Sequence, residues 1–398
     1  MRPLTQRRAN VIFCLLQVGY WGMFAAFCGF QTAIILDRGF RQSAAGLFVS
    51  LGCLSGIFAQ PILGRWLDRH PEIPVKRAFG VCMALALGVH MVFLFTRPGF
   101  FGTALIFLLL GVLETNAYPL IDSIAVHMIA AGLDVDYSLG RGLGSLSYGV
   151  VCILVGRQTA VWGVESALVT HAVLLAGMIC FAAACPALPG CPVRPNGERS
   201  HSALYLLRQN RAYTLMLAGG FFGMAAVLPL SSFAVTLVTS KGGDSADLGV
   251  VMFLMAALEF PAAFLFQYLR RRFSCQRIQV LAMFFMMLKP VVYRLSGSLH
   301  AFFAAQSIQI LGYGIFTPAN VYYTNENIAP EDRVQGQSLK TVLTNGMGGV
   351  VGNLMAGAVI DRGGVGALLA VSTALGAVGV LFSLLSVRER ARQERAAV

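Results

Sequence analysis

Long apolar stretches separated by short polar segments occupy nearly the whole chain. Each stretch reaches the ~20 residues that a helix needs to cross the hydrocarbon core of a bilayer, whereas a transmembrane β-barrel shows short segments of alternating hydrophobicity. The pattern therefore predicts an all-α membrane protein. The twelve predicted transmembrane helices are residues 10–36, 44–64, 77–96, 100–130, 138–160, 164–185, 211–238, 247–269, 277–296, 299–325, 334–360 and 364–386.

Residues 186–202 interrupt this pattern with four prolines, two glycines and two arginines, as a connection between domains does. The sequences on either side resemble each other, because Ser43-Ala44-Ala45 begins the second predicted helix and Ser245-Ala246-Asp247 begins the eighth. Parallel repeats of six helices build one large class of transporter. We therefore expect an N-terminal half at residues 1–185, a cytoplasmic linker at 186–210 and a C-terminal half with a short basic tail at 211–398.

The net charge of +12 is distributed as membrane topology requires, which argues against nucleic acid as a partner. The segments on the side of the termini hold 22 Lys and Arg residues, and the opposite loops hold 7. By the positive-inside rule, both termini are expected in the cytoplasm, in the inner membrane of a bacterium. The apolar stretch after Met1–Asn10 is too long for a signal peptide, so it is expected to be the first spanning helix.

Motifs for other chemistry are missing from the sequence. The nine cysteines form no CxxC pair and no zinc spacing, so they predict no metal site and no cofactor. The chain has no HExxH, no G-x-S-x-G and no paired intramembrane aspartates, which argues against an enzyme.

Four ionisable residues lie inside the apolar stretches, namely Glu114, Asp122, Glu259 and Lys289. Such a side chain at the bilayer centre costs at least ~2.5–3.5 kcal/mol, so it usually faces a water-filled cavity and marks a substrate or ion path. We expect these residues, with Arg141, to carry the function of a transporter.

The second predicted helix ends in Gly64-Arg65-Trp66-Leu67-Asp68-Arg69. Gly64 permits a tight turn, and Asp68 can cap a neighbouring helix. This run resembles the G-x-x-x-D-R signature of major facilitator superfamily transporters. The resemblance implies a cytoplasmic gate built from Gly64, Asp68 and Arg69, although His70-Pro71-Glu72 replaces the usual residues that follow. The alternative is an ordinary charged loop.

Pro119-Leu120-Ile121-Asp122 and Tyr137–Ser145 are similar to elements of the branch that contains lactose permease, the oligosaccharide–proton symporters and the nucleoside–proton symporters. The resemblance implies that Asp122 and Arg141 bind the solute as a bidentate Arg–carboxylate pair, which suits hydroxyl recognition. Leu139 stands where the pattern has a first arginine. A plain salt bridge between two helices is the alternative.

Glu259-Phe260-Pro261 resembles the E-x-P element of the same branch, and Lys289 stands at the distance where that branch has arginine. The resemblance makes Glu259 a proton-coupling or substrate-binding acid and Lys289 its charge partner. A static ion pair is the alternative. Because Gln309 replaces the histidine of many relatives, proton coupling has less support than solute binding.

Further candidates come from polar and aromatic residues within the helices. Asn320 and Tyr323 can hydrogen-bond a solute or pack, and Trp21 can stack on a sugar ring or base or pack in the bundle. Glu114 lies two turns from Asp122 and can extend a polar path for protons, or bond to Tyr118. Two further sets are histidines expected to be hydrogen-bonded within the bundle and glycines expected to form a smooth helix-packing face. These sets are His90, His127 and His171, and Gly346, Gly348, Gly349 and Gly352.

The sequence thus predicts a monomeric secondary transporter that takes up a sugar or nucleoside with a proton by alternating access. The lack of the proline-containing glycine motif of drug–proton antiporters in the fifth predicted helix favours import. An organic anion transporter, an uncoupled uniporter and a nutrient sensor with a transporter fold are the alternatives.

Overall fold

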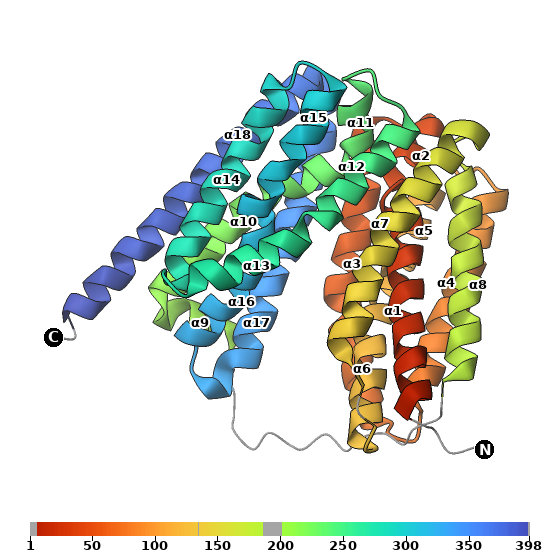
Figure 1. Ribbon diagram of the computed structural model, residues 1–398, viewed down its shortest axis with the longest axis horizontal. Helices are drawn as coiled ribbons and strands as arrows, with labels where there is room; N and C mark the ends of the chain where they lie inside the picture. Colours follow the sequence, from red (N-terminus) through yellow and green to blue (C-terminus); the bar gives the residue numbers. More distant parts are fainter. Residues whose placement is uncertain (1–5, 134, 186–200, 397–398) are drawn as a thin grey trace. The chain divides into compact units, whose positions relative to one another are not determined.

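The computed structural model describes residues 6–133, 135–185 and 201–396 (Figure 1). Helices form the regular structure of these residues, and no strand occurs among them, which confirms the all-α prediction. The elements are α1 (Gln6–Cys28), α2 (Gln31–Asp37), α3 (Gln42–Arg69), α4 (Val75–Phe95), α5 (Phe100–Thr115), α6 (Ala117–Ala130), α7 (Tyr137–Trp162), α8 (Ser166–Ala184), α9 (Ala203–Gln209), α10 (Arg211–Ser232), α11 (Ala234–Thr239), α12 (Ser245–Ala257), α13 (Glu259–Arg270), α14 (Cys275–Leu295), α15 (Leu299–Ala305), η1 (Gln306–Gln309), η2 (Ile310–Gly314), α16 (Ile315–Asn327), η3 (Pro330–Asp332), α17 (Arg333–Thr341), η4 (Val342–Met347) and α18 (Gly348–Ala396).

Within the described residues, 11 helical stretches are long and apolar enough to cross a membrane. The last one, Arg333–Gln393, has 61 residues and leaves helical geometry at Gly364, where φ is 67°. Before Gly364, Gly348 lies against Phe221 of α10 and Gly352 lies against Ala225. After Gly364, Gly379 lies against Gly219 of α10 and Ser386 lies against Ala212. The neighbour's number rises before Gly364 and falls after it, so this stretch is a hairpin whose two arms are the last two predicted helices. Glycine suits the turn because it adopts positive φ without a steric penalty.

The chain divides into two compact units. One contains the described residues up to 185 together with Asp244–Phe253, and the other contains the described residues 201–243 and 254–396. Most of the predicted linker, residues 186–200, lies outside the described residues. Its remaining part includes the short helix α9, whose first turn is capped by the Ser202 side chain.

In the first unit, α1 packs along α7 and α8, α4 lies beside α8, and α3 lies beside α5 (Figure 1). Small residues bring α1 and α7 together. A Cβ added to Gly140 would lie 2.5 Å from the Phe13 ring, and one added to Gly144 would lie 2.5 Å from Trp21. Glycine at these two positions therefore lets large rings of α1 pack directly on the α7 backbone.

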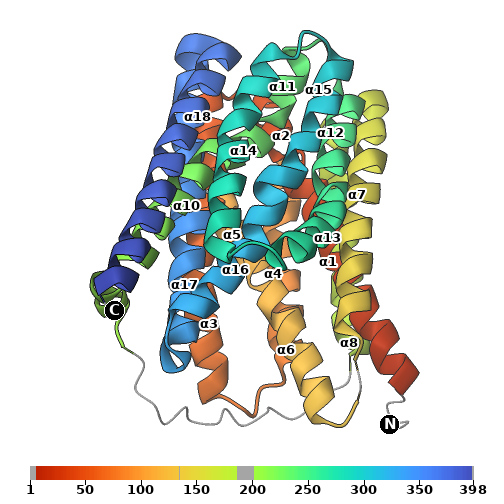
Figure 2. The same ribbon diagram turned by 60° about the vertical axis from the view of Figure 1, so that its left-hand side comes forward.

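In the second unit, α10 packs against both arms of α18, and α14 lies beside α18 (Figure 2). Added Cβ atoms at Gly348, Gly349 and Gly352 would lie 2.9, 3.1 and 2.7 Å from atoms of α10. The predicted close packing is confirmed for these three glycines.

Several predicted helices are broken near their centres, among them the following two. The helix predicted at 100–130 divides at Asn116 into α5 and α6. The helix predicted at 299–325 passes through the 3₁₀ turn η1 and the π-helical turn η2, with Gly312 at φ −93° and ψ −108°. Pro318 contributes to the second break because it has no N–H to donate to the carbonyl of Gly314. Single π-helical turns occur often at functional sites.

Candidate functional site

The first unit contains a cluster of aromatic rings. They are Tyr20, Trp21 and Phe24 of α1, Tyr118 of α6 and Tyr148 of α7. The Trp21 ring lies 5.8 Å from that of Tyr118 and 6.4 Å from that of Tyr148, both edge-on. The residues of α1 are one and four positions apart, so they project from one side of that helix. Three helices therefore contribute to a single aromatic surface.

Arg141 of α7 lies on this aromatic surface. Its Cζ is 4.2 Å from the centroid of the Trp21 ring and 5.2 Å from that of Tyr118. Its Nη1 is buried without a hydrogen-bond partner among the described residues, and so is Nε2 of Gln17. The Gln17 Oε1 accepts from Trp21 Nε1 at 3.1 Å. Two buried donors without acceptors thus adjoin the same indole ring.

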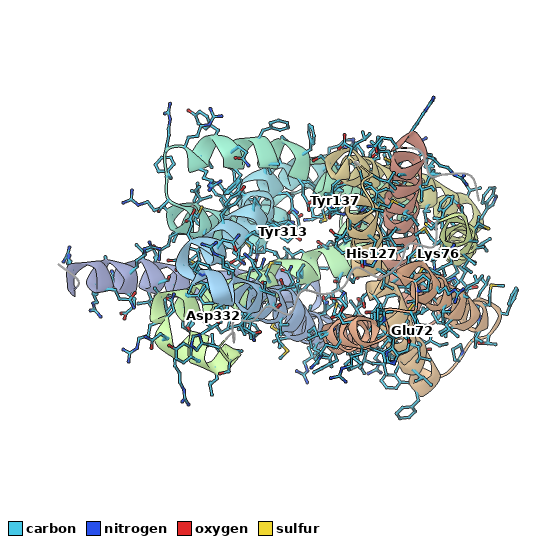
Figure 3. All side chains as sticks on the ribbon, turned by 90° about the horizontal axis from the view of Figure 1, so that it is seen from below. Glu72, Lys76, His127, Tyr137, Tyr313 and Asp332 are labelled. Atoms are coloured by element: carbon cyan, nitrogen blue, oxygen red, sulfur yellow. The ribbon has the colours of Figure 1, made fainter. Side chains whose placement is uncertain are left out.

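Asp122 of α6 is half-buried and accepts a hydrogen bond of 3.0 Å from the Tyr137 hydroxyl. That hydroxyl lies 3.5 Å from the hydroxyl of Tyr118. Figure 3 labels Tyr137 among the side chains of the molecule. No nitrogen of Arg141 lies within 4.0 Å of an Asp122 oxygen in the described part of the chain. The expected bidentate Arg–carboxylate pair is therefore wrong for this structure, as is the simple salt bridge. The Asp122 carboxylate instead accepts a hydrogen bond from a tyrosine hydroxyl, and the Arg141 guanidinium stacks on aromatic rings.

Glu114 lies at the end of α5, beside the break before α6, and its predicted alternative partner Tyr118 is not the one found. Its Oε1 lies 3.4 Å from His171 Nε2 of α8. The other ring nitrogen of His171 lies 3.0 Å from Nδ1 of His90, whose Nε2 lies 2.8 Å from the Leu168 carbonyl oxygen. The expectation of hydrogen-bonded histidines within the bundle is confirmed for His90, and for His171 through its Nδ1. The Nε2 of His171 has no hydrogen-bond partner among the described residues.

In the second unit, Lys289 of α14 is only 3% exposed and donates a hydrogen bond of 2.6 Å to Gln309 Oε1 in η1. One turn further along α14, the Tyr293 hydroxyl donates to Gln306 Oε1 at 2.5 Å. The 3₁₀ turn thus presents two glutamine side chains to α14. Glu259 is exposed at the start of α13 and interacts electrostatically with Lys289.

Asn320 and Tyr323 of α16 lie in the packed interior of the second unit. The Asn320 Oδ1 accepts from Gln279 Nε2 at 3.0 Å, and the Tyr323 hydroxyl lies 3.4 Å from Ser386 Oγ. The Ser386 hydroxyl in turn donates to the carbonyl of Ala212 at 2.6 Å. Their contacts are therefore those of helix packing, and a role in solute binding stays a prediction.

The residues of the gate motif lie on the last turns of α3, which runs five residues beyond its predicted end. Gly64, Asp68 and Arg69 are all exposed. Gly64 is helical and an added Cβ would meet nothing within 4 Å, so the expected tight turn at this residue is wrong. The N-cap residue of α4 is Pro74 and no side chain caps that helix, so Asp68 does not cap α4.

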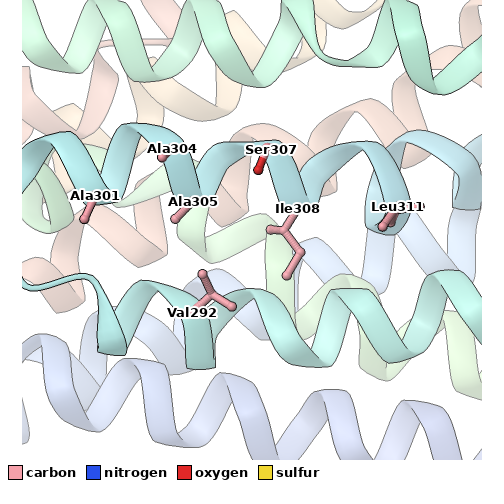
Figure 4. Close-up of a pocket in the computed structure, with 7 residues that line it drawn as sticks. All are labelled: Val292, Ala301, Ala304, Ala305, Ser307, Ile308 and Leu311. Atoms are coloured by element: carbon pink, nitrogen blue, oxygen red, sulfur yellow. The ribbon is translucent and has the colours of Figure 1, made fainter.

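A groove of about 510 Å³ lies between α14 and the helix that begins at α15 (Figure 4). Its walls are mostly alanine and aliphatic side chains, with Val292 on one side and Ser307 and Ile308 on the other. It contains none of the predicted site residues.

The protein-family comparison gives a match over residues 13–370, nearly the whole chain, to the MFS_1 like family. The chain belongs to this family of the major facilitator superfamily. Maltose permease of Geobacillus stearothermophilus is 26% identical over 364 residues, which are 88% of each protein.

Solved structures share the fold. A crystal structure of a mutant of nucleoside transporter NupG has a TM-score of 0.83 at 14% identity, over 96% of this chain and 99% of that one. A structure of peptide transporter POT with sulfate has a TM-score of 0.74 at 15% identity, over 96% and 94%. This major facilitator protein is therefore a multi-pass membrane transporter and not an enzyme.

Proposed function

We propose that this transporter imports a neutral polyhydroxylated solute, a sugar or a nucleoside, together with a proton, by alternating access. The observation that carries the proposal is the pair of buried donors beside Trp21, Arg141 Nη1 and Gln17 Nε2, which lack acceptors among the described residues. A buried donor left unpaired costs about 1–3 kcal/mol. Hydroxyl oxygens of a solute would supply both acceptors, and its ring would lie against the aromatic cluster.

The surrounding chemistry supports this class of solute. Sugar and nucleoside rings bind aromatic faces, while their hydroxyls need donors and acceptors in fixed positions. Arg141 supplies donors, and Asp122, with the hydroxyl of Tyr137, supplies an acceptor and a group of both kinds. The names of the maltose permease relative and of the NupG structure point to the same two solute classes.

An organic anion is the second candidate, and one observation favours it. The guanidinium of Arg141 has no carboxylate within 4.0 Å in the described part of the chain. A carboxylate or phosphate group of a solute would pair with it more strongly than a hydroxyl does.

For the proton, we propose Glu259 as the coupling acid and Lys289 as the residue whose charge responds to it. Lys289 is buried, and its hydrogen-bond partner Gln309 is neutral and does not compensate its charge. The charge of Glu259 therefore acts on Lys289. Glu114 is the corresponding acid of the first unit. An uncoupled uniporter remains the alternative for this part of the proposal.

The remaining assignments complete the proposed cycle. Gly64, Asp68 and Arg69 would belong to the cytoplasmic gate, and both termini would lie in the cytoplasm of a bacterial cell. Asn320 and Tyr323 would be solute-binding residues of the second unit, and the monomer would be the working form.

The test uses purified protein in proteoliposomes on a solid-supported membrane, with maltose, uridine and gluconate added in turn. We expect a sustained, pH-dependent current with maltose or uridine. The Arg141→Ala variant should lose it, while Arg157→Ala, an exposed arginine on the same helix, should keep it. Current with gluconate alone would establish that the solute is an organic anion. Uptake of a neutral solute without current or pH dependence would establish uniport.

A further inference from the structure

We propose that Glu114, His171 and His90 form a proton-binding site inside the first unit, which holds one exchangeable proton between Glu114 Oε1 and His171 Nε2. Its use in coupling rests on the proposed function, whereas the binding of the proton does not. The sequence motifs assign no role to either histidine.

The three side chains come from three helices, α5, α8 and α4. The side chains of His171 and Glu114 are 0% and 7% exposed. Phe27 of α1 packs on His171, with ring centroids 4.9 Å apart, and lies edge-on to His90 at 5.8 Å. The imidazoles are therefore enclosed by helix and aromatic packing.

The direction of each hydrogen bond can be worked out by starting from the Leu168 carbonyl, which is the last partner in this row of contacts. The Leu168 carbonyl oxygen can only accept, so Nε2 of His90 carries a hydrogen and donates to it at 2.8 Å. In neutral His90, Nδ1 is then an acceptor. Nδ1 of His171, 3.0 Å away, must therefore be the donor. The Nε2 of neutral His171 is left with a lone pair that faces Glu114.

One proton position, between Glu114 Oε1 and His171 Nε2, is left to be filled. Glu114 Oε1 and His171 Nε2 lie 3.4 Å apart, and neither has another hydrogen-bond partner among the described residues. Two lone pairs facing each other in a buried site repel, and one proton removes this repulsion. The proton rests either on Glu114, as a carboxylic acid beside a neutral imidazole, or on His171, as an imidazolium beside a carboxylate. Both forms have zero net charge, and release of the proton to water leaves one carboxylate charge.

Of the three side chains, only that of Glu114 has any exposed surface. Glu114 Oε1 is buried, so the exposed 7% of the side chain belongs to its other atoms, while His171 has no exposed surface. A proton would therefore enter and leave through Glu114 and be held by His171.

Other titratable groups face the site from neighbouring helices. Tyr20 and Cys28 of α1 interact electrostatically with Glu114, and Arg38 interacts with His90. Tyr20 also interacts with Arg141, and its ring lies 5.3 Å from that of Trp21. Loss of the proton would thus place a negative charge at Glu114, which only Tyr20 separates from the proposed solute site. Proton release would in this way change the electrostatic potential at the solute.

Infrared spectroscopy of the purified protein without solute, titrated over pH, tests the binding site directly. We expect a carboxylic-acid C=O band that disappears as the pH is raised, is missing in Glu114→Gln, and is kept in Glu72→Gln, an exposed glutamate of the same unit. In the wild-type protein labelled with ¹⁵N-histidine, the His171 Nε2 signal should titrate with this band while its Nδ1 stays protonated. This second measurement needs no variant to fold. Identical infrared titrations of wild type and Glu114→Gln, together with a His171 signal that does not respond to pH, would overturn the site.

The coupling role has its own test, in proteoliposomes with whichever of maltose or uridine the wild type carries. Glu114→Gln should lose accumulation driven by a pH gradient completely and retain solute exchange. Full gradient-driven accumulation in this variant would overturn the coupling role and leave the proposed transport function intact. Lack of transport of either solute by the wild type would contradict the proposed function, while the infrared result would still stand.

Discussion

One methyl group on Gly144 tests whether the aromatic cluster binds the solute. In Gly144→Ala, the new Cβ would lie 2.5 Å from Trp21 Cδ1 and 3.3 Å from the Gln17 carbonyl oxygen. Carbon atoms pack favourably at about 3.5–4.0 Å, so the indole must move by about 1 Å or more. That movement disturbs the ring on which Arg141 stacks at 4.2 Å.

The size of the effect follows from these contacts. The cation–π contact contributes about 0.5–2 kcal/mol, so its loss weakens solute binding by about 2- to 30-fold. Overpacking at the same time costs about 1–3 kcal/mol of stability. The control is Gly142→Ala on the same helix, where an added Cβ meets nothing within 4 Å. It should bind normally and gain about 0.5–1 kcal/mol from helix propensity.

The assay has two readouts. Titration calorimetry with the solute that the wild type transports gives the dissociation constant, and thermal unfolding gives the change in stability. If Gly144→Ala loses stability and binds as tightly as Gly142→Ala, Trp21 and Arg141 do not belong to the solute site. Weaker binding in Gly144→Ala alone supports the aromatic cluster as the solute site.

Three further predictions follow from other parts of the chain. Glu259→Gln should abolish uptake driven by a pH gradient and preserve exchange in proteoliposomes; unchanged accumulation would reject the coupling assignment. Gly352→Leu should lower the thermal unfolding temperature far more than Gly366→Leu, because an added Cβ lies 2.7 Å from the α10 backbone at Gly352 and meets nothing within 4 Å at Gly366. The backbone N–H and the imidazole of His201 hold the pKa of Asp332 below its usual value. The stability from this contact is therefore fully present above the usual carboxyl pKa and is lost as pH falls through the lowered one. The unfolding temperature of the wild type should exceed that of Asp332→Asn at neutral pH, with the difference vanishing in acid; a difference that persists in acid would exclude the contact.

The spanning helices were predictable because apolar length alone determines them. The hairpin turn at Gly364 falls where the last two predicted helices meet, and the glycine-rich face of Gly348, Gly349 and Gly352 does lie against α10. The breaks at Asn116 and Gly312 were not predicted, because a short loss of helical hydrogen bonding leaves the hydropathy pattern unchanged.

The site was less predictable than the fold, because charge and motif spacing do not determine which neighbour a side chain selects. Asp122 and Arg141 carry complementary charges, yet each has nearer partners, namely the Tyr137 hydroxyl and the Trp21 ring. The available signal was Gly144, one turn after Arg141, which makes room for the indole. For His171 the sequence offered only a polar residue in an apolar helix, and its partner Glu114 is far away along the chain.

Three ionisable groups within the helices share a feature that bears on mechanism. Arg141 lies on aromatic rings, Lys289 donates to the neutral amide of Gln309, and Glu114 faces an imidazole. A direct buried salt bridge would hold each charge near a fixed opposite charge, and removing either partner would cost about 3–5 kcal/mol. Neutral partners hold the side chain in place and leave its charge uncompensated at short range. A solute or a proton can then supply the missing charge or acceptor without breaking an ion pair. This lowers the cost of changing occupancy during a transport cycle, and it is the physical reason to look for binding and coupling at these three residues.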